Sequence, residues 1–195
     1  MNDGNYSHSE NLHVIINEAL KLAKKSFEDI DAIAVSKGPG SFTGLRIGVS
    51  AAKGLCFSLD KPLISVSTLE SLANSITVEN DAFIVPLLDA RRMEVYSAVF
   101  DSQYDQIRMI KAEVIDENSF SDYLNKGNVY FLGDGAGKCK DVIRHKNAIF
   151  LEGHFPSAKQ MAKLAYAKYK KNDFEDVAYF EPFYLKDFLI TKPKS

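Results

Sequence analysis

Apolar residues repeat at helical spacing near the start of the chain. They share one face of a predicted amphipathic helix over residues 9–25. Its apolar positions include Leu12, Ile15, Ile16, Ala19, Leu22 and Ala23. Ser7 and Glu10 have the spacing of a capping box, which marks the start of this helix.

A second helix is predicted over residues 41–58, after an apolar strand at 32–35 and a glycine turn at 37–40. Glycine takes backbone angles that other residues avoid, and proline cannot donate to a sheet ladder. Ser41 and Thr43 offer hydroxyl groups to the free N–H groups of the helix. A strand, glycine turn and helix in this order are typical of an anion site, and a tight turn with a capped helix is the alternative.

Two stripes run side by side along this second helix. The small stripe holds Gly44, Gly48 and Ala51, and the apolar stripe holds Leu45, Val49, Ala52 and Cys56. Glycine inside a helix costs about 0.5–1 kcal/mol relative to alanine. The helix glycines therefore indicate the close approach of another backbone, either a sheet of the same chain or a partner helix.

The pattern then moves from helix–strand alternation to strands alone. A strand at 63–66 and a capped helix at 67–76 complete an α-β-α-β-α order, which predicts a parallel sheet with helices on its faces. Strands at 83–88, 93–100 and 106–114 predict an antiparallel meander.

Two details of the meander are predicted as well. Pro86 places the first strand at a sheet edge or a bulge. The second strand alternates, so its residues fall on two opposite faces. One face holds Met93, Val95, Ser97 and Val99, and the other holds Tyr96, Ala98 and Phe100.

Shorter elements fill the rest of the chain. We expect a helix near 120–124, strands at 129–132 and 149–151, and a helix that Ser157 caps. An extended segment at 180–185 precedes a basic tail, which we expect to be loose.

Composition places the chain among ordinary globular proteins. The 195 residues are 46% hydrophobic and carry a formal net charge of −2, which argues against a stand-alone nucleic-acid binder. Cys56 and Cys139 are expected to be reduced thiols of a cytoplasmic protein. The pattern of a signal peptide and an apolar run of membrane-spanning length are both missing, so we expect no membrane partner.

The sequence holds little catalytic chemistry. It has no serine nucleophile elbow, and His8 and His13 are poorly spaced for a metal on one helix face, so we expect neither catalytic nor metal-binding residues. The loop at 133–138 is a weak nucleotide-loop candidate through Gly133, Asp134, Gly135 and Gly137. It is one residue short of a Walker A loop, and Cys139 stands where a serine or threonine binds magnesium, so a flexible β-to-α turn is the alternative.

Several segments resemble the bacterial TsaB (YeaZ) family. The longest are S-K-G-P-G-S-F-T-G-L-R-I-G-V-S-A-A-K-G-L-C at 36–56 and K-P-L-I-S-V-S-T-L-E-S-L-A at 61–73. Residues 8–12, 88–96 and 181–185 match further landmarks, so the resemblance covers nearly the whole chain. The family takes part in making threonylcarbamoyladenosine at position 37 of tRNA.

The resemblance implies an α/β, actin/Hsp70-like ATPase (ASKHA) fold of two ribonuclease-H-like subdomains. We assign 1–76 to the first subdomain, 77–175 to the second and 176–195 to a C-terminal extended segment and tail. The family pattern begins with a further strand and hairpin, so we expect the first subdomain to lack its N-terminal strands. The catalytic paralogue has an Asn-His-x-x-x-His metal motif, and this chain has Thr68 and Leu72 in place of the histidines.

The resemblance therefore implies a non-catalytic subunit that pairs with the catalytic subunit TsaD, joined by the ATPase TsaE. The first two helices form the pairing surface in the family, and the same surface makes homodimers. Here we expect that surface to use Leu12, Ile15, Ile16, Ala19, Gly44, Leu45, Gly48, Val49, Ala51 and Ala52.

The same resemblance sets the expected cofactors. No cofactor is expected on the chain alone, the wider complex uses ATP, and tRNA is met only through the complex. The competing functions are an actin-like ATPase acting through the 133–138 loop and a degenerate glycoprotease-type peptidase.

Overall fold

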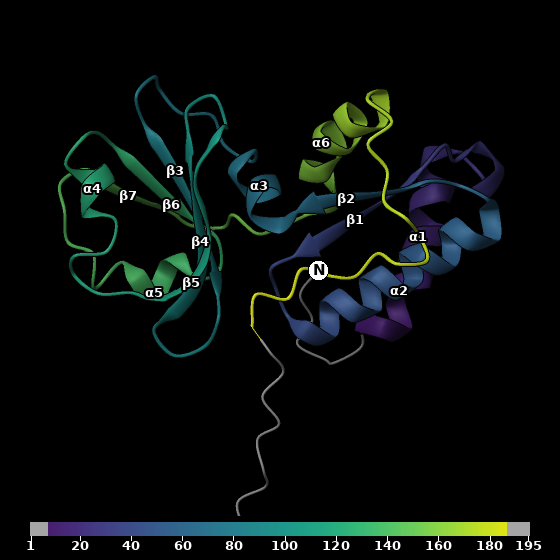
Figure 1. Cartoon of the computed structure of the whole chain (residues 1–195), viewed down its shortest axis with the longest axis horizontal. Helices are drawn as coiled ribbons and strands as arrows, with labels where there is room; N and C mark the ends of the chain where they lie inside the picture. Colours follow the sequence, from purple (N-terminus) through teal and green to yellow (C-terminus); the bar gives the residue numbers. More distant parts are fainter. Residues whose placement is uncertain (1–7, 187–195) are drawn as a thin grey trace, which may run out of the picture.

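Two β-sheets organise the chain, and each builds one lobe of the computed structural model, which describes residues 8–186 (Figure 1). The first lobe has a parallel pair, β1 (Ile33–Gly38) and β2 (Leu63–Ser67). The second lobe has a five-stranded mixed sheet in the order β5-β4-β3-β6-β7. Its strands are β3 (Phe83–Asp89), β4 (Glu94–Asp101), β5 (Gln106–Val114), β6 (Val129–Leu132) and β7 (Ala148–Leu151).

Helices cover the first sheet on both faces. The long helix α2 (Phe42–Leu59) packs its buried stripe on Val35 and Leu63, and α6 (Ala158–Lys170) packs on Ile64 and Val66 from the other side. Figure 1 shows the first sheet between these two helices. The remaining helical elements are α1 (His8–Ala23), η1 (Phe27–Asp29), α3 (Thr68–Ala73), α4 (Ser121–Leu124) and α5 (Ala136–Cys139).

Local signals place most element boundaries correctly. Helix α2 begins where the hydroxyl oxygen of Ser41 accepts a hydrogen bond from the N–H of Gly44, and α6 begins with a Ser157 capping box. The capping box predicted at Ser7 starts outside the described residues. Strand β1 continues to Gly38, three residues further than expected, because residues 36 and 38 still pair with β2.

The meander is confirmed, and its two faces are those predicted. Val95 and Val99 of β4 belong to one buried core, whereas Ala98 and Phe100 belong to the other. The edge position expected from Pro86 is wrong, because β3 is the central strand of the sheet. The bulge alternative is not observed either, because the β3–β4 register is the same on both sides of Pro86. The sheet accommodates the proline by leaving residues 85 and 86 out of the β3–β4 pairing, while Pro86 still pairs with Leu132 of β6.

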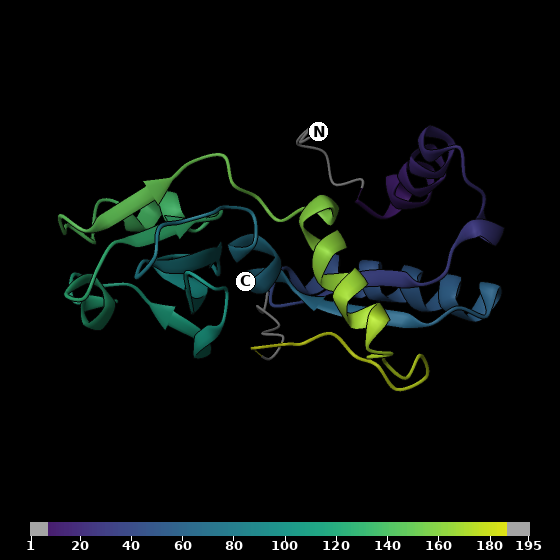
Figure 2. The same cartoon turned by 90° about the horizontal axis from the view of Figure 1, so that it is seen from above.

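The boundary expected at residue 175 needs a correction. Helix α6, which we assigned to the second subdomain, returns to the first lobe, where Ala165 and Leu164 pack on β2. Figure 2 shows the chain crossing from β7 back to α6. The second lobe of the described chain therefore closes with β7, and an apolar helix face decides the assignment of α6.

The segment after α6 runs back along the first lobe (Figure 2). The N–H of Glu175 donates to the carbonyl oxygen of Leu63, and the N–H of Phe183 donates to that of Lys37 at 2.7 Å. The ammonium of Lys53 donates to the carbonyl oxygens of Ala178 and Phe180. The extended piece predicted at 180–185 is thus held against β1 and α2, and the tail expected from Thr191 lies outside the described residues.

No helix within residues 8–186 has the length and apolar character needed to cross a membrane.

Candidate functional site

Helix α1 lies on the surface of the first lobe and buries little of its apolar stripe. Ile15 is 57% exposed and Leu22 is 86% exposed, whereas Leu12 and Ile16 are half-buried. Among the α1 side chains that the structure describes, none belongs to a buried core cluster. An amphipathic helix of this length is marginal in water unless packing covers its apolar face. Half of the apolar stripe is therefore left uncovered by the described chain.

An open groove of about 520 Å³ lies between α1 and α2. Leu12 and His13 line it from α1. Its α2 wall consists of small and apolar residues at helical spacing, namely Ile47, Ser50, Ala51, Gly54, Leu55 and Ser58. This third stripe of α2 was missed in the sequence, although its spacing of three and four residues was a usable signal.

The structure divides the predicted pairing residues into two groups. Residues on or near the surface are Leu12, Ile15, Ile16, Ala19, Gly44, Gly48 and Ala51. Leu45, Val49 and Ala52 are buried in the chain's own core, so their assignment to a pairing surface is corrected. These three residues face the first sheet. Of the two alternatives that the sequence left open, a sheet of the same chain therefore covers this face of α2.

The helix glycines also divide. A methyl group added at Gly48 would lie 3.9 Å from Val35, so only this glycine faces the sheet. A methyl group at Gly54 would meet nothing within 4 Å, and one at Gly44 would meet only Ser41 of its own turn. Close approach to the sheet therefore does not account for Gly44 and Gly54.

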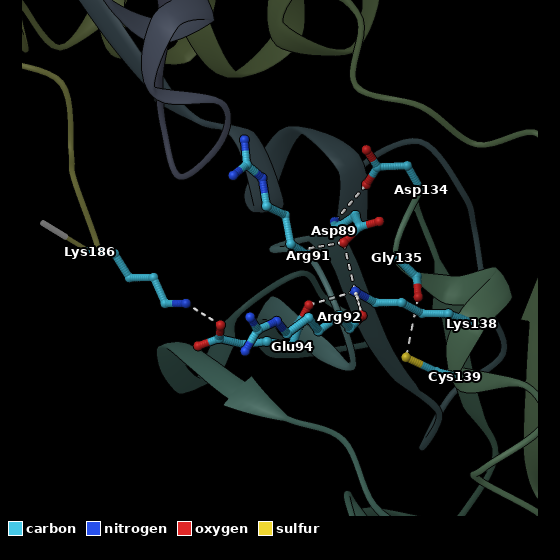
Figure 3. A network of polar contacts seen from close by, with 9 residues as sticks. All are labelled: Asp89, Arg91, Arg92, Glu94, Asp134, Gly135, Lys138, Cys139 and Lys186. Carbon is cyan, nitrogen blue, oxygen red and sulfur yellow. Dashed lines mark hydrogen bonds and ion pairs between the residues drawn. The ribbon is translucent and has the colours of Figure 1, made fainter. Parts of the chain in front are cut away.

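A second candidate is the polar network around the 133–138 loop (Figure 3). The ammonium of Lys138 donates to the Asp89 carboxylate at 2.6 Å and to the carbonyl oxygens of Arg92 and Glu94, each at 2.7 Å. A lysine ammonium has three donors, so all three are used. The network ties α5 to the end of β3 and the β3–β4 turn, and it leaves Lys138 no free donor for a phosphate.

Asp89 is the acidic centre of this network. Its carboxylate also accepts a hydrogen bond from the N–H of Arg91, and its own N–H donates to the Asp134 carboxylate. Partial burial raises the pKa of Asp89, but the hydrogen bond and charge of Lys138 and the Arg91 N–H together hold it below its usual range. Asp89 is therefore ionised at neutral pH and paired with Lys138.

The glycines of the loop have structural reasons. Gly133 has a φ of +110°, and a methyl group there would lie 2.2 Å from the carbonyl oxygen of Leu87. A methyl group at Gly135 would lie 3.0 Å from the backbone of Leu88, whereas one at Gly137 would meet nothing within 4 Å. Gly133 and Gly135 thus seat the loop against the end of β3.

Cys139 completes the loop from the inside. Its thiol is buried and donates to the carbonyl oxygen of Gly135 at 3.2 Å. Burial raises the pKa of Cys139 to about 11, so the thiol stays protonated at neutral pH. Across residues 8–186 we find no group of three or more side chains placed to hold a metal ion.

Comparisons with known proteins agree on one family. The family model for TsaD, tRNA N6-adenosine threonylcarbamoyltransferase, matches residues 4–192. The chain is 34% identical over 191 residues to a tRNA threonylcarbamoyladenosine biosynthesis protein TsaB of Bacillus subtilis, covering 92% of this chain and 80% of that protein. It is 28% identical over 195 residues to the TsaB protein of Escherichia coli, covering 95% of this chain and 83% of that protein.

The fold has solved counterparts. One is the crystal structure of an uncharacterized protein with similarity to peptidase YEAZ from Pseudomonas aeruginosa. It matches with a TM-score of 0.79 and 25% sequence identity, covering 92% of this chain and 84% of that chain. The two lobes of Figure 1 are those of an actin-like, ribonuclease-H-like fold.

Proposed function

Because the chain belongs to the TsaB (YeaZ) family, we propose that it takes part in forming threonylcarbamoyladenosine in tRNA as a non-catalytic subunit. Its role is to pair, through α1 and α2, with a TsaD-type catalytic subunit, with a TsaE-type ATPase completing the assembly. In this proposal ATP is used by the wider complex, tRNA is met through the complex, and the chain forms a homodimer when alone.

One observation carries the pairing role. Half of the α1 apolar stripe is exposed, beside a groove whose α2 wall is made of small residues. Covering Ile15 and Leu22 removes apolar surface from water, at about 25 cal/mol per Å². Small residues on α2 let another helix approach closely, so a helical partner surface fits here better than an extended peptide.

The residues in place of the paralogue's histidines support a non-catalytic role. Leu72 is fully buried in the core between α3 and the second sheet, and it has no metal-binding atom. Thr68 is also buried, and its hydroxyl group shares a 2.6 Å hydrogen bond with Ser36. Neither side chain offers a metal ligand of the kind that two histidines supply.

The pairing is tested by charged substitutions on the exposed stripe. We expect Ile15→Asp and Leu22→Asp to abolish assembly with a TsaD-type subunit in analytical ultracentrifugation, because each places a charge in an apolar interface. Met109→Asp is the matched control, since Met109 is 76% exposed on β5 in the other lobe. Unchanged assembly of both α1 variants, with melting temperatures like the wild type, would refute the pairing surface.

The biosynthetic role needs a test of its own. Expressed in bacteria depleted of their TsaB protein, the wild-type chain should restore threonylcarbamoyladenosine in bulk tRNA, measured by mass spectrometry of nucleosides. The α1 variants should fail to do so, whereas Met109→Asp should succeed. Failure of the wild-type chain beside a TsaD-type partner that it binds would contradict the role.

The lack of nucleotide chemistry in the chain alone is a further part of the proposal. The three ammonium donors of Lys138 already form hydrogen bonds with Asp89, Arg92 and Glu94. We therefore expect no stoichiometric Mg-ATP binding by the purified chain in calorimetry and no ATP hydrolysis above background. Tight one-to-one binding would favour the ATPase alternative.

A further inference from the structure

The β3–β4 turn contains two adjacent arginines in left-handed backbone conformation. Arg91 has a φ of 72° and Arg92 a φ of 50°. Side chains with a β-carbon rarely adopt these angles, and tight hairpin turns that need them favour Asn-Gly or Asp-Gly. A turn selected only to reverse the chain would not use two arginines, so their side chains are expected to have a further use.

The network below the turn holds it in this conformation. The carboxylate of Asp89 accepts from the N–H of Arg91, and the ammonium of Lys138 donates to the carbonyl oxygen of Arg92. The N–H of Ala90 donates to the carbonyl oxygen of Glu94, and the N–H of Glu94 donates back to that of Arg91. The strained backbone is therefore fixed from below, while both arginine side chains remain exposed.

Of the acids drawn around the turn, Asp89 and Glu94 have cationic partners, whereas Asp134 has no ion-pair partner within residues 8–186. Asp89 is paired with Lys138, and Glu94 is paired with Lys186 at the end of the C-terminal segment (Figure 3). Within residues 8–186 neither guanidinium group has an ion-pair partner, and Figure 3 shows Arg91 extending away from the Asp89–Lys138 contact. Two guanidinium groups without an ion-pair partner in the described chain thus extend from one turn, and Figure 3 shows them leaving it in different directions.

We propose that Arg91 and Arg92 form a binding site for the phosphodiester backbone of RNA, an inference that rests on the proposed role in tRNA modification. The planar guanidinium group matches phosphate oxygens in a two-pronged geometry, and a pre-organised turn loses little entropy on binding. With a net charge of −2 the chain has no general attraction for RNA, so binding depends on this local pair.

The decisive variant is Arg91→Asn/Arg92→Gly, because asparagine and glycine suit the left-handed conformation better than arginine does. It should keep or raise the melting temperature and, in the assembly with a TsaD-type subunit, weaken binding of a fluorescent tRNA transcript at least tenfold, as measured by anisotropy. A loss of this size corresponds to about one charge-assisted hydrogen bond. The slope of log affinity against log salt should fall by about 1–2, the value for two lost phosphate contacts.

Two control measurements distinguish this site from a diffuse attraction between opposite charges. Arg144→Gln/Lys146→Gln removes two exposed cations elsewhere in the second lobe and should leave the affinity within about twofold of the wild type, since neither residue belongs to the turn. Poly-glutamate should compete for the site much less well than RNA of equal charge, because a phosphate binding site is proposed and not a protein carboxylate site.

Two results would overturn the inference. One is RNA binding by Arg91→Asn/Arg92→Gly within twofold of the wild type, and the other is equal competition by poly-glutamate. Both are measured on the assembly, after analytical ultracentrifugation has shown that the variant still pairs with the TsaD-type subunit, so a loss of pairing is not mistaken for a loss of RNA binding. A chain that fails to restore tRNA modification but binds RNA through the two arginines would refute the proposed function and keep this site.

Discussion

The Lys138 ammonium lies 2.6 Å from the Asp89 carboxylate, and this ion pair joins helix α5 to the end of strand β3 across 49 residues of sequence. Lys138 is 19% exposed and Asp89 is 48% exposed. The pair is therefore more than a surface contact, because the same ammonium also holds two backbone carbonyl oxygens. The attachment of α5 to the end of β3 should therefore depend on it.

Replacing Lys138 with methionine should lower the free energy of unfolding by about 2 kcal/mol, the order expected when hydrogen bonds to a charged group are removed from a half-buried site. Lys140→Met is the matched control, because Lys140 and its partner Glu152 are well exposed and 3.5 Å apart. Its effect should stay within about 0.5 kcal/mol. Urea unfolding measures both, and equal effects would show that the three contacts of Lys138 contribute nothing specific.

The same pair predicts a pH dependence. Burial raises the pKa of Asp89, but the hydrogen bonds from Lys138 and Arg91 and the Lys138 charge outweigh it, so the folded-state pKa lies below the unfolded value of about 3.9. The stabilisation is then fully present above about pH 4 and is lost as the pH falls through the folded-state pKa.

Asp89→Asn tests that sign. The stability difference between the wild type and this variant should be constant from about pH 5 to 7 and should narrow below about pH 4. Urea unfolding at several pH values measures it. A stability difference between the wild type and Asp89→Asn that increases as the pH falls would mean that the folded-state pKa of Asp89 is raised.

Gly133→Ala should cost at least about 2 kcal/mol, because the alanine methyl would meet the Leu87 carbonyl oxygen and the residue would need a φ of +110°. Gly137→Ala should be neutral or slightly stabilising, since nothing lies within 4 Å and alanine favours the helix. Thermal unfolding of the two variants measures how much stability each glycine contributes. Similar effects on both would argue that neither glycine is required by contact with β3.

Sequence patterns predicted the helices and strands better than they predicted which of these elements pack against one another. The alternation of residues in β4 was sufficient to predict which side chains share a face. Alternate residues of a strand point to opposite sides of the sheet, and each side of β4 packs in a core of its own. Pro86 was misplaced because edge preference depends on which N–H groups pair, and that depends on the register with β4. The return of α6 to β2 and the partners of Lys138 depend on contacts between distant residues, which no local pattern contains.

The groove between α1 and α2 provides a further test of pairing. A leucine at Gly48 would press on Val35, so its effect would mix folding with assembly. Gly54 is the better position, because a side chain there meets nothing within 4 Å and enters the groove. The Gly54→Leu variant should therefore fold normally but no longer bind the partner subunit.

Gly54→Ala provides the control for that experiment. It should gain up to about 0.8 kcal/mol of helix stability and lose much less of the assembly, since a methyl group fills little of the groove. Calorimetric titration with the partner subunit measures both variants. Equal affinity of Gly54→Leu and the wild type would place the pairing surface away from the groove.

The outer edge of β1 leads to the last prediction, which concerns hydrogen exchange. The N–H of Ile33 donates to the carbonyl oxygen of Pro62 next to β2, and alternate strand residues point to opposite edges. Ala34 therefore directs its N–H away from β2, and it is exposed. In the five-stranded sheet, by contrast, Val95 lies between β3 and β5 with pairing on both sides.

We expect the Ala34 amide to exchange on the order of 100-fold faster than the Val95 amide, because edge groups open without unfolding the lobe. The β1 and β2 amides together should also exchange faster than those of β4, since a two-stranded sheet depends on helix packing for its stability. Val35, which faces β2, is the internal comparison for Ala34. Exchange at Ala34 as slow as at Val95 would mean that another strand covers this edge in solution, and adding excess partner subunit would then show whether that strand belongs to the chain or to its partner.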